Sequence, residues 1–302
     1  MKVKCDITFI IVSHNSAKTL RGSIESCLMA AKEFDRLKVR IVVYDNASAD
    51  ESPKIIHEFV EKYPQVFIGI QGQQNLGFAR GNNQAIAASP SREYVLVNPD
   101  VMFKPEAIRH LQNTLYSASD IAVVCPQLLN LDRTPQKSIR RFPTFTYLFL
   151  KHFLKEKLLN SVCKFDYYYA EMTPPEKAVE INWGIGAFML ISGDYIAKHG
   201  LFDERFFLYF EDVSLCLDAW QNGYRVLYQP QASALHLYSQ ASTSSKFNYL
   251  TFIHIVSALK FFAKYRPYQI QWQLISWLID VNTKLMNSAR LSKSRKILIG
   301  NG

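Results

Sequence analysis

Cysteines, acidic side chains and long apolar runs are all scarce in this sequence of 302 residues. The five cysteines are odd in number, widely spaced and lack a Cys-x-x-Cys pair, which argues against a disulfide framework and a zinc site and favours a reducing compartment. No apolar run reaches the roughly 20 residues of a membrane-spanning helix, and the first residues lead into a strand pattern without a cleavage site. We therefore expect no signal peptide and a protein that is soluble or peripheral to a membrane.

A glycine-rich turn is also missing after the first apolar run. Residues 13–16 read Ser-His-Asn-Ser, whereas dinucleotide-binding enzymes place closely spaced glycines at this point to approach the pyrophosphate. This absence argues against a nicotinamide-dependent oxidoreductase.

Positive charge is abundant but unevenly placed. The net charge is +9, and residues 246–302 hold nine Lys or Arg against the single acid Asp280, a net charge of +8. Trp272 and Trp277 lie among these basic residues, a composition typical of segments that lie on anionic lipid. Nucleic acid would be the competing ligand, but no nucleic-acid-binding motif accompanies the charge. The alternative is that these helices pack on the body of the protein or form a homodimer interface.

Short apolar runs alternate with amphipathic helical patterns in the first 125 residues, which predicts an α/β fold with a doubly wound, mostly parallel sheet. We expect strands at 6–13, 39–44, 66–70, 94–97, 121–124, 186–192, 224–228 and 232–237. Residues 126–180 are less regular and predict an insertion with short helices, either a lid or a structural excursion. Amphipathic helices are expected at 247–264 and 270–285. The predicted division is a catalytic domain at 1–245 and a basic helical tail at 246–302.

Three polar clusters follow predicted strands, at residues 13–16, 45–48 and 98–100. Ligands of doubly wound sheets gather outside the carboxyl ends of the strands, so these clusters are candidate ligand contacts. Ordinary Asx turns and helix caps are the alternative for the second and third clusters. His236 lies on an apolar strand, where a hydrogen-bonded core histidine is the alternative to a metal ligand.

An adjacent carboxylate pair, Glu211 and Asp212, follows an aromatic run and opens a predicted helix that Gly223 can end with a left-handed residue. Burial beside aromatic side chains raises a carboxyl pKa, which suits one of the pair to general-base work near neutral pH. The alternative is that the helix dipole favours two acids in the first turn.

Taken in order, these motifs resemble the family 2 glycosyltransferases of the GT-A fold, over residues 6–240. The matching residues are Ile-Val-Ser-His-Asn at 11–15, Tyr-Asp-Asn-Ala-Ser at 44–48, Asn-Leu-Gly-Phe at 75–78 with Asn82, Asn-Pro-Asp at 98–100, 184–190, 202–207 through Glu211 and Asp212, 223–226, and His236. Within this family the sequence looks most like bacterial rhamnosyltransferases of O-antigen and cell-wall polysaccharide assembly. The resemblance to this subfamily lies in the Asn-Pro-Asp form, in residues 138–143 and in Trp183-Gly184.

The resemblance implies a role for each matching residue. Asp212 would be the catalytic base and Glu211 its orienting neighbour. Asp100 and His236 would bind a divalent cation, Mg²⁺ or Mn²⁺, and Asp45 would pair with the imide nitrogen of a uracil or thymine base. The expected donor-binding set is Ser13, Asn15, Asp45, Asn75, Arg80, Asn82, Asn98 and Asp100. Trp183 and Arg140 are candidate acceptor and phosphate contacts, with core packing and a solvated surface as their respective alternatives.

This sequence departs from the family pattern at two positions. Asn98 stands where relatives commonly have the first acid of an Asp-x-Asp motif, so the cation would arrive largely on the nucleotide diphosphate. Ser214 stands where relatives often have a further acid, and we expect altered hydrogen bonding there without loss of catalysis.

The resemblance implies an inverting, metal-assisted transferase of a deoxysugar, L-rhamnose from dTDP-L-rhamnose, to a lipid-linked saccharide. Such a protein would lie in the cytoplasm, peripheral at the inner face of the cell membrane. The alternatives are a UDP-sugar-dependent galactosyl or N-acetylhexosaminyl transferase and a catalytically silent nucleotide-sugar-binding subunit.

Overall fold

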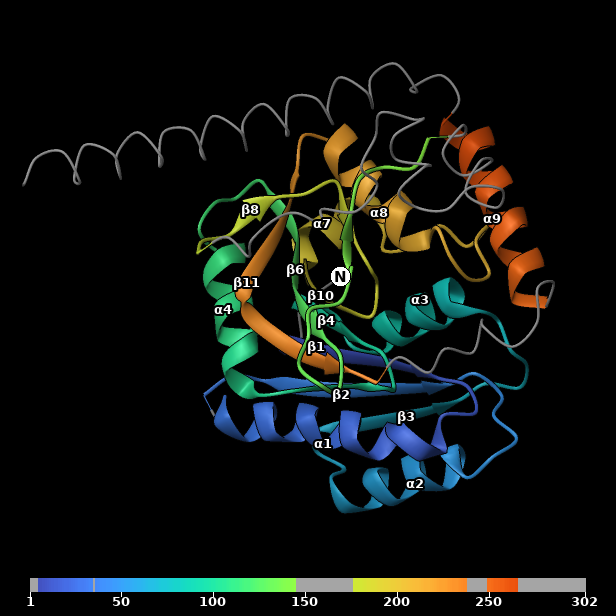
Figure 1. Cartoon of the computed structure of the whole chain (residues 1–302). Helices are drawn as coiled ribbons and strands as arrows, with labels where there is room; N and C mark the ends of the chain where they lie inside the picture. The colour runs from blue at the N-terminus through green and yellow to red at the C-terminus, as the bar shows by residue number, and fades with distance from the viewer. Residues whose placement is uncertain (1–4, 35, 145–175, 238–248, 266–302) are drawn as a thin grey trace, which may run out of the picture.

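A central mixed sheet organises the protein. The computed structural model describes residues 5–34, 36–144, 176–237 and 249–265. Within these residues the main sheet has nine strands in the order β3-β2-β1-β4-β10-β6-β11-β5, with β8 beside β11 (Figure 1). The strands are β1 (Cys5–Ser13), β2 (Val39–Asp45), β3 (Phe67–Gln71), β4 (Ser91–Val97), β5 (Val101–Phe103), β6 (Ile121–Leu129), β8 (Val179–Glu180), β10 (Phe188–Ser192) and β11 (Arg225–His236).

Most strands of this sheet point the same way. The pairs β1–β2, β1–β4, β2–β3 and β6–β11 are parallel, while β10 runs antiparallel to both β4 and β6. The short strands β5 and β8 pair antiparallel with β11. The predicted doubly wound, mostly parallel α/β fold is therefore confirmed.

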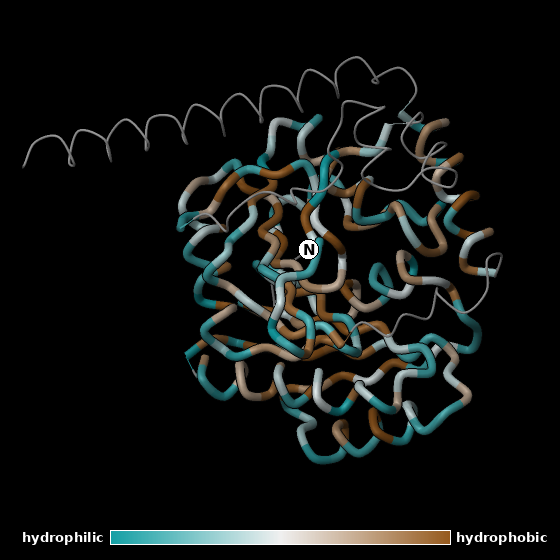
Figure 2. The backbone as a smooth tube through the Cα atoms, viewed as in Figure 1, coloured by the Kyte–Doolittle hydropathy of each residue, from teal (hydrophilic) through white to brown (hydrophobic). Residues whose placement is uncertain are grey.

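Helices cover both faces of the sheet, which explains why its strands are apolar on both sides. The helices are α1 (Ala17–Glu33), α2 (Ser52–Lys62), α3 (Phe78–Ala88), α4 (Pro105–Leu115), α7 (Gly193–His199), α8 (Glu211–Gln221) and α9 (Tyr249–Tyr265). Alternate residues of β1 serve opposite faces: Phe9 packs in a core with side chains of α1, α2 and α4, whereas Ile10 packs in a core with side chains of α3, α8 and α9. Figure 2 shows the apolar strands inside a more polar periphery.

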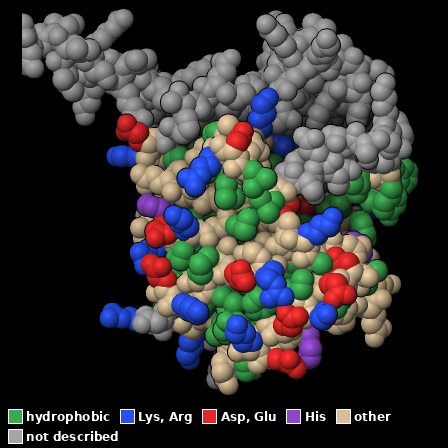
Figure 3. All heavy atoms as spheres, turned by 60° about the horizontal axis from the view of Figure 1, so that its bottom comes forward, with side chains coloured by type: hydrophobic (Ala, Val, Ile, Leu, Met, Phe, Trp, Pro, Cys, Tyr) green, Lys and Arg blue, Asp and Glu red, His purple; other side chains and the backbone are tan. Residues whose placement is uncertain are grey.

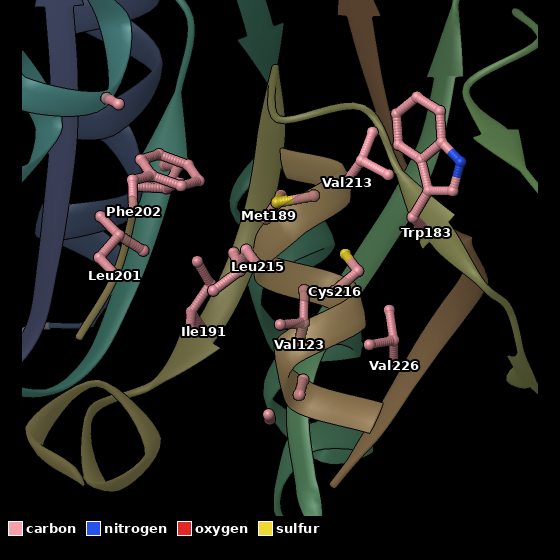
Figure 4. Close-up of a cluster of buried hydrophobic side chains, with 14 of the residues drawn as sticks. Val123, Trp183, Met189, Ile191, Leu201, Phe202, Val213, Leu215, Cys216 and Val226 are labelled. Atoms are coloured by element: carbon pink, nitrogen blue, oxygen red, sulfur yellow. The ribbon is translucent and has the colours of Figure 1, made fainter. Parts of the chain in front are cut away.

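The second of these cores includes the buried side chains of α8, the helix that begins with Glu211 and Asp212. Val213, Leu215 and Cys216 of α8 are buried in this core, which also contains Val123 of β6, Met189 and Ile191 of β10 and Val226 of β11 (Figure 4). Burying a side chain of this size contributes about 1.5–3 kcal/mol. This packing fixes α8 against the sheet, and with it the two carboxylates in the first turn of α8.

Several predicted boundaries were wrong. Residues 224–228 and 232–237 form one strand, β11, with an irregularity between Gln229 and Ser233, and not two strands. Strand β6 continues to Leu129, so the irregular segment begins later than 126, and residues 78–83 belong to α3 and not to a loop. Strand β5 and helix α7 were not predicted. Within the segment 126–180 the structure describes β7 (Ile139–Arg140), which pairs with β9 (Trp183–Gly184), and β8; its predicted short helices fall on 145–175, outside the described residues.

Helix α9, the first part of the predicted tail, packs on the body of the protein. Its buried side chains are Ile253, Ser257, Phe261, Phe262 and Tyr265, and the phenylalanine and tyrosine rings join the same core as α8. The alternative of packing on the body therefore applies to this helix. The predicted second helix, 270–285, lies outside the described residues. Among the helices that the structure describes, none is both long and apolar enough to cross a bilayer.

The face formed by α1 and α2 carries charges of both signs (Figure 3). Exposed ion pairs join Arg21 to Glu58 and Lys54 to Glu51. A nucleic-acid interface needs clustered positive charge, and this mixed face does not offer it.

Candidate active site

The ends of strands β1, β2 and β4 place three polar clusters at one edge of the sheet. Ser13, the last residue of β1, lies beside Asp45, the last residue of β2, in the parallel register. The loops that follow are tied together, because the Asn15 backbone N–H donates to Ser48 Oγ at 2.9 Å and the Ala49 N–H donates to Asn15 Oδ1 at 2.8 Å. Asn15 takes a left-handed conformation, with φ 52°, which asparagine tolerates well.

Asp45 is fully buried and presents one unsatisfied oxygen. Its Oδ2 accepts hydrogen bonds from the Ser48 N–H at 2.9 Å and from Gln71 Nε2 at 2.7 Å, while Oδ1 has no hydrogen-bond partner. Ser13 Oγ is likewise buried without a partner. A buried acceptor without a donor costs about 1–3 kcal/mol, so these two atoms mark a place where a ligand could complete the hydrogen bonding.

Asn75 and its neighbours shape the turn before α3. The Asn75 side-chain oxygen accepts from Asn46 Nδ2 and from the Gly77 N–H, each at 2.9 Å. Asn82 is buried and donates to the Phe78 carbonyl of its own helix at 2.9 Å. Arg80 is half-exposed and pairs with Glu204 at 3.3 Å. Asn75 and Asn82 therefore support the backbone of this turn, and Arg80 joins it to the loop after α7.

The loop from Phe202 to Phe210, which leads into α8 and the candidate base, is held to α3 by hydrogen bonds. Asn83 makes a two-way contact with Phe202: Nδ2 donates to the Phe202 carbonyl at 2.8 Å and Oδ1 accepts from the Phe202 N–H at 3.1 Å. The Phe78 N–H donates to the Phe207 carbonyl at 2.7 Å. Gly77 has φ +84°, and a Cβ there would lie 2.3 Å from the Phe207 carbonyl oxygen, so only glycine fits this approach.

Glu211 and Asp212 begin α8 immediately after two left-handed residues. Tyr209 and Phe210 both have φ 69°, an unusual conformation for aromatic residues, and such strain concentrates at functional sites. Asp212 Oδ2 accepts from the Gly186 N–H at 3.0 Å, and Oδ1 accepts from the Val213 N–H at 2.8 Å. Glu211 Oε2 is buried without a hydrogen-bond partner.

These environments separate the two carboxyl groups electrostatically. Burial, reinforced by the Asp212 charge, raises the pKa of Glu211 well above its usual range. Burial also raises the pKa of Asp212, but the Gly186 and Val213 N–H groups and the Arg140 charge oppose that rise. The backbone hydrogen bonds that Asp212 accepts, and that Glu211 Oε2 lacks, favour the negative charge on Asp212. A general base must be ionised to take a proton, so these hydrogen bonds suit Asp212 better than Glu211 to that role.

Asn98 and Asp212 are linked through one short segment. The Asn98 N–H donates to the Ala187 carbonyl at 2.8 Å, and the neighbouring Gly186 N–H donates to Asp212. The turn after β4 and the first turn of α8 thus meet on either side of residues 186–187. Asn98 Oδ1 and Asp100 Oδ1 are both buried without a hydrogen-bond partner.

Asp100 and His236 form a pair that suits a cation. His236 Nε2 lies 3.5 Å from Asp100 Oδ1, and the Leu237 N–H donates to the Asp100 carbonyl at 2.8 Å. Imidazole nitrogen and carboxylate oxygen are ligands of Mn²⁺ and related ions. In the part of the chain that the structure describes, no group of three His, Cys, Asp or Glu side chains is placed to hold a metal. The pair by itself would offer a cation two ligands, so other groups would have to supply the rest.

Arg140 and Trp183 lie together on the strand pair β7–β9. The Arg140 guanidinium sits over the Trp183 ring at 5.1 Å, and Trp183 Nε1 donates to the Arg141 carbonyl at 2.8 Å. Trp183 is only 4% exposed, so it packs in the core and offers Arg140 a fixed aromatic surface.

Comparison of the sequence with known protein families shows which family the chain belongs to. The profile described as Glycosyl transferase family 2 matches residues 8–173, more than half of the chain. The chain belongs to this family. As a family 2 glycosyltransferase it is also similar to rhamnosyltransferase WbbL of Escherichia coli, with 24% identity over 275 residues that cover 86% of this chain and 94% of the relative. A second relative is N-acetylglucosaminyl-diphospho-decaprenol L-rhamnosyltransferase of Mycobacterium tuberculosis, 27% identical over 209 residues, which cover 66% of each chain.

Solved structures support the GT-A fold of this glycosyltransferase. GalNAc-T7 with UDP, GalNAc and Mn²⁺ superimposes with a TM-score of 0.61 at 15% identity, over 80% of this chain and 45% of that chain. The mannosyltransferase PcManGT of Pyrobaculum calidifontis, with GDP-Man and Mn²⁺, gives a TM-score of 0.55 at 14% identity, over 80% of this chain and 59% of that one. At such identities the likeness concerns the fold alone.

Three side chains near the site were missed in the sequence. Gln71 holds Asp45, Asn83 holds the loop before α8, and Gln136 contacts His236. None belongs to a motif with a recognisable spacing. Asn83 follows Asn82 directly, and only the rotation of α3 decides which of the two faces the loop.

Proposed function

We propose that this glycosyltransferase is an inverting rhamnosyltransferase that uses dTDP-L-rhamnose and a lipid-linked saccharide acceptor in cell-surface polysaccharide synthesis. The observation that carries the proposal is the buried carboxyl pair at the start of α8, in which Asp212 receives two backbone N–H groups and Glu211 Oε2 receives no hydrogen bond. Both relatives described above bear the name of rhamnosyltransferases, which supports the choice of sugar.

Asp212 acts as the general base in this proposal. Its carboxylate takes the proton of the acceptor hydroxyl while that oxygen forms a bond to the anomeric carbon. The bond from the anomeric carbon to the diphosphate oxygen breaks, and the diphosphate leaves with the bonding electrons. Because attack comes from the face opposite the leaving group, the configuration inverts. Glu211, in its protonated form, donates a hydrogen bond that orients the acceptor or Asp212.

The donor nucleotide would lie over the ends of β1 and β2. The unsatisfied Asp45 Oδ1 is an acceptor for the imide N–H of thymine or uracil, and Ser13 Oγ lies at the neighbouring strand end. Arg80, half-exposed on α3, is available to the phosphates, and Asn15, Asn75 and Asn82 would hold the surrounding backbone.

Charge on the leaving diphosphate needs neutralisation. A bound Mg²⁺ or Mn²⁺ would act as a Lewis acid on the diphosphate oxygens. Asp100 and His236 would hold such a cation, with the unsatisfied Asn98 Oδ1 beside them in the chain. Asn98 in place of an acid lowers the negative charge of the site by one, so we expect weak binding of the free metal and stronger binding of its complex with a nucleotide.

The acceptor would approach from the side of β7 and β9. Arg140 is close enough to Asp212 to lower its pKa, so the guanidinium can meet an acceptor phosphate near the base. Trp183 would keep Arg140 in place. A lipid-linked acceptor requires a membrane surface, and we propose that residues 266–302, with their excess of Lys and Arg, lie on the inner face of the cell membrane.

A donor screen that measures nucleoside diphosphate release in the presence of membrane lipid extract tests the proposal. We expect release from dTDP-L-rhamnose, and a loss of about 10²–10⁴-fold in Asp212→Asn, the usual contribution of a general base. Asp120→Asn serves as the control, because Asp120 makes an exposed pair with Arg225 before β6, away from the carboxyl ends of the strands. Undiminished release by Asp212→Asn would show that the base was misassigned.

UDP-sugars are the second candidate donors. The observation that favours them is the unsatisfied Asp45 Oδ1, which would accept from an imide N–H of either uracil or thymine. Ligand-dependent protection against thermal unfolding separates the two, since only a bound nucleotide-sugar raises the melting temperature. Absence of release by the wild type with every donor, despite such protection, would favour a catalytically silent subunit.

A further inference from the structure

Gln136 contacts His236 at two points. It lies between β6 and β7, a hundred residues from His236 in the sequence. Its Oε1 is 2.9 Å from His236 Nδ1, and its Nε2 donates to the His236 carbonyl oxygen at 2.9 Å. One amide group thus meets both the ring and the backbone of the same histidine.

The surroundings of Gln136 fix the direction of its amide group. Besides the His236 carbonyl, Nε2 donates to Asn130 Oδ1 at 3.0 Å and lies 3.5 Å from the Leu129 carbonyl. All these partners are acceptors, so turning the amide over would set its oxygen against them. Oε1 must therefore face His236 Nδ1, and Nδ1 must carry the hydrogen of this contact.

This tautomer has a direct consequence for the other ring nitrogen. In a neutral imidazole with a hydrogen on Nδ1, the lone pair is on Nε2, and Nε2 lies 3.5 Å from Asp100 Oδ1. A divalent cation beside these two atoms would be bound by the nitrogen lone pair and by the carboxylate oxygen. The pairing of β11 with β5, in which His236 is opposite Val101, keeps the two side chains at this separation.

We propose that Gln136 is a positioning residue that fixes the tautomer and ring orientation of His236 so that its Nε2, with Asp100, faces a divalent cation bound to the donor diphosphate. This inference rests on the proposed metal-assisted function. Metal-binding histidines commonly donate their second ring N–H to a fixed acceptor, and loss of that acceptor typically weakens metal binding 10- to 100-fold.

Two substitutions separate this role from a merely structural one. Gln136→Met removes both polar contacts at similar length, whereas Gln136→Glu keeps an oxygen acceptor for Nδ1–H but loses the donor to the His236 carbonyl. If Gln136 only supported the backbone, both variants would behave alike. If it fixes the tautomer, Gln136→Glu retains metal binding and Gln136→Met does not. Gln112→Leu is the matched control, because Gln112 bonds to Glu93 elsewhere in the fold.

The first measurement is the tautomer of His236 in protein labelled with ¹⁵N-histidine, by long-range ¹H–¹⁵N correlation without metal. We expect a hydrogen on Nδ1 in the wild type and in Gln136→Glu, and a mixture in Gln136→Met. The second is Mn²⁺ binding in the presence of dTDP, followed by the electron paramagnetic resonance of free Mn²⁺. We expect about 10- to 100-fold weaker binding in Gln136→Met and unchanged binding in Gln112→Leu.

A hydrogen on Nε2 in the wild type, or equal Mn²⁺ affinity in Gln136→Met and wild type, would overturn the assignment. Equal weakening of Mn²⁺ binding in Gln136→Met and Gln136→Glu would also overturn it, because that result indicates that Gln136 only supports the backbone. Wild-type protein that turns over a donor without any metal would refute the metal-assisted part of the proposed function itself, which is a separate result.

Discussion

The hydroxyl of Tyr265 should contribute measurably to stability, because it joins α9 to α8, the helix that begins with the carboxyl pair Glu211 and Asp212. It lies 2.6 Å from Ser214 Oγ and donates to Asp218 Oδ1 at 2.7 Å, and the side chain is 2% exposed. Lys264 completes the network with contacts to Asp218 at 2.9 Å and Asp203 at 3.1 Å. Ser214 belongs to the same network, because its Oγ also accepts a hydrogen bond from Lys264 Nζ at 3.1 Å.

Tyr265→Phe removes the hydroxyl and leaves the ring packing intact. The lost hydrogen bond to the Asp218 carboxylate is worth about 1.5–3 kcal/mol, since one partner is charged. Lys264 remains as a partner for both Ser214 and Asp218, which keeps the loss toward the lower end of that range. A loss of about 2 kcal/mol corresponds to a melting temperature lower by roughly 4–8 °C in a domain of this size.

Urea denaturation followed by tryptophan fluorescence and thermal unfolding followed by circular dichroism both measure this loss. Tyr249→Phe is a matched control, because Tyr249 lies on the same helix but is 70% exposed, so its change should stay within about 0.5 kcal/mol. A Tyr265→Phe variant as stable as Tyr249→Phe would refute the idea that α9 is held to the body by this network.

Three further predictions concern the loop, the carboxyl pair and the tail. Gly77→Ala should destabilise the protein by at least about 2 kcal/mol in urea titrations, because alanine is strained at φ +84° and its Cβ meets the Phe207 carbonyl; a neutral effect would contradict the close approach. Glu211→Gln should gain stability relative to wild type as pH rises above about 4.3, by up to about 1.4 kcal/mol per pH unit. The pKa of Glu211 is raised in the folded state, so its contribution to the free energy of unfolding is fully present at low pH and is lost as pH rises. A difference in stability between the two proteins that does not change with pH would contradict this. A chain ending at Arg266, which keeps α9, should lose flotation with anionic liposomes, while the full chain floats; equal flotation would assign membrane binding elsewhere.

The sequence predicted the sheet well where strands are apolar on both faces and flanked by helices. The strands ending at Ser13 and Asp45 were correct to within one residue, because their apolar runs end abruptly at polar side chains. Strand β5 was missed because three residues give no periodicity and its partner, β11, lies more than 130 residues further along the chain. Register with a distant strand is a tertiary property that local pattern does not encode.

Motif positions made Asp45, Asp100 and Asp212 candidates from the sequence, as they did for four asparagines. The supporting amides Gln71, Asn83 and Gln136 were not predicted. Asp45, Asp100 and Asp212 follow strand ends or open a helix, positions with a general physical meaning. Asn83 and Gln136 act through contacts to Phe202 and His236, more than 99 residues away in the chain. An amide on a helix or loop has no signature until the fold brings its partner beside it.

Asp212 depends on support from two sides, and this has consequences for how the enzyme can be altered. On the donor side, Asn83 and Phe78 hold the loop before α8, while on the other side Ser257 donates to the Leu208 carbonyl and Lys260 to the Arg205 carbonyl. The left-handed residues Tyr209 and Phe210 are strained, and strain of about 1–3 kcal/mol per residue persists only where the surroundings impose it. Removing either set of contacts would let this loop relax, and the carboxylate would then move away from the Gly186 N–H. We therefore expect a truncation before α9 to displace the Asp212 carboxylate, and the tail is best removed after Tyr265.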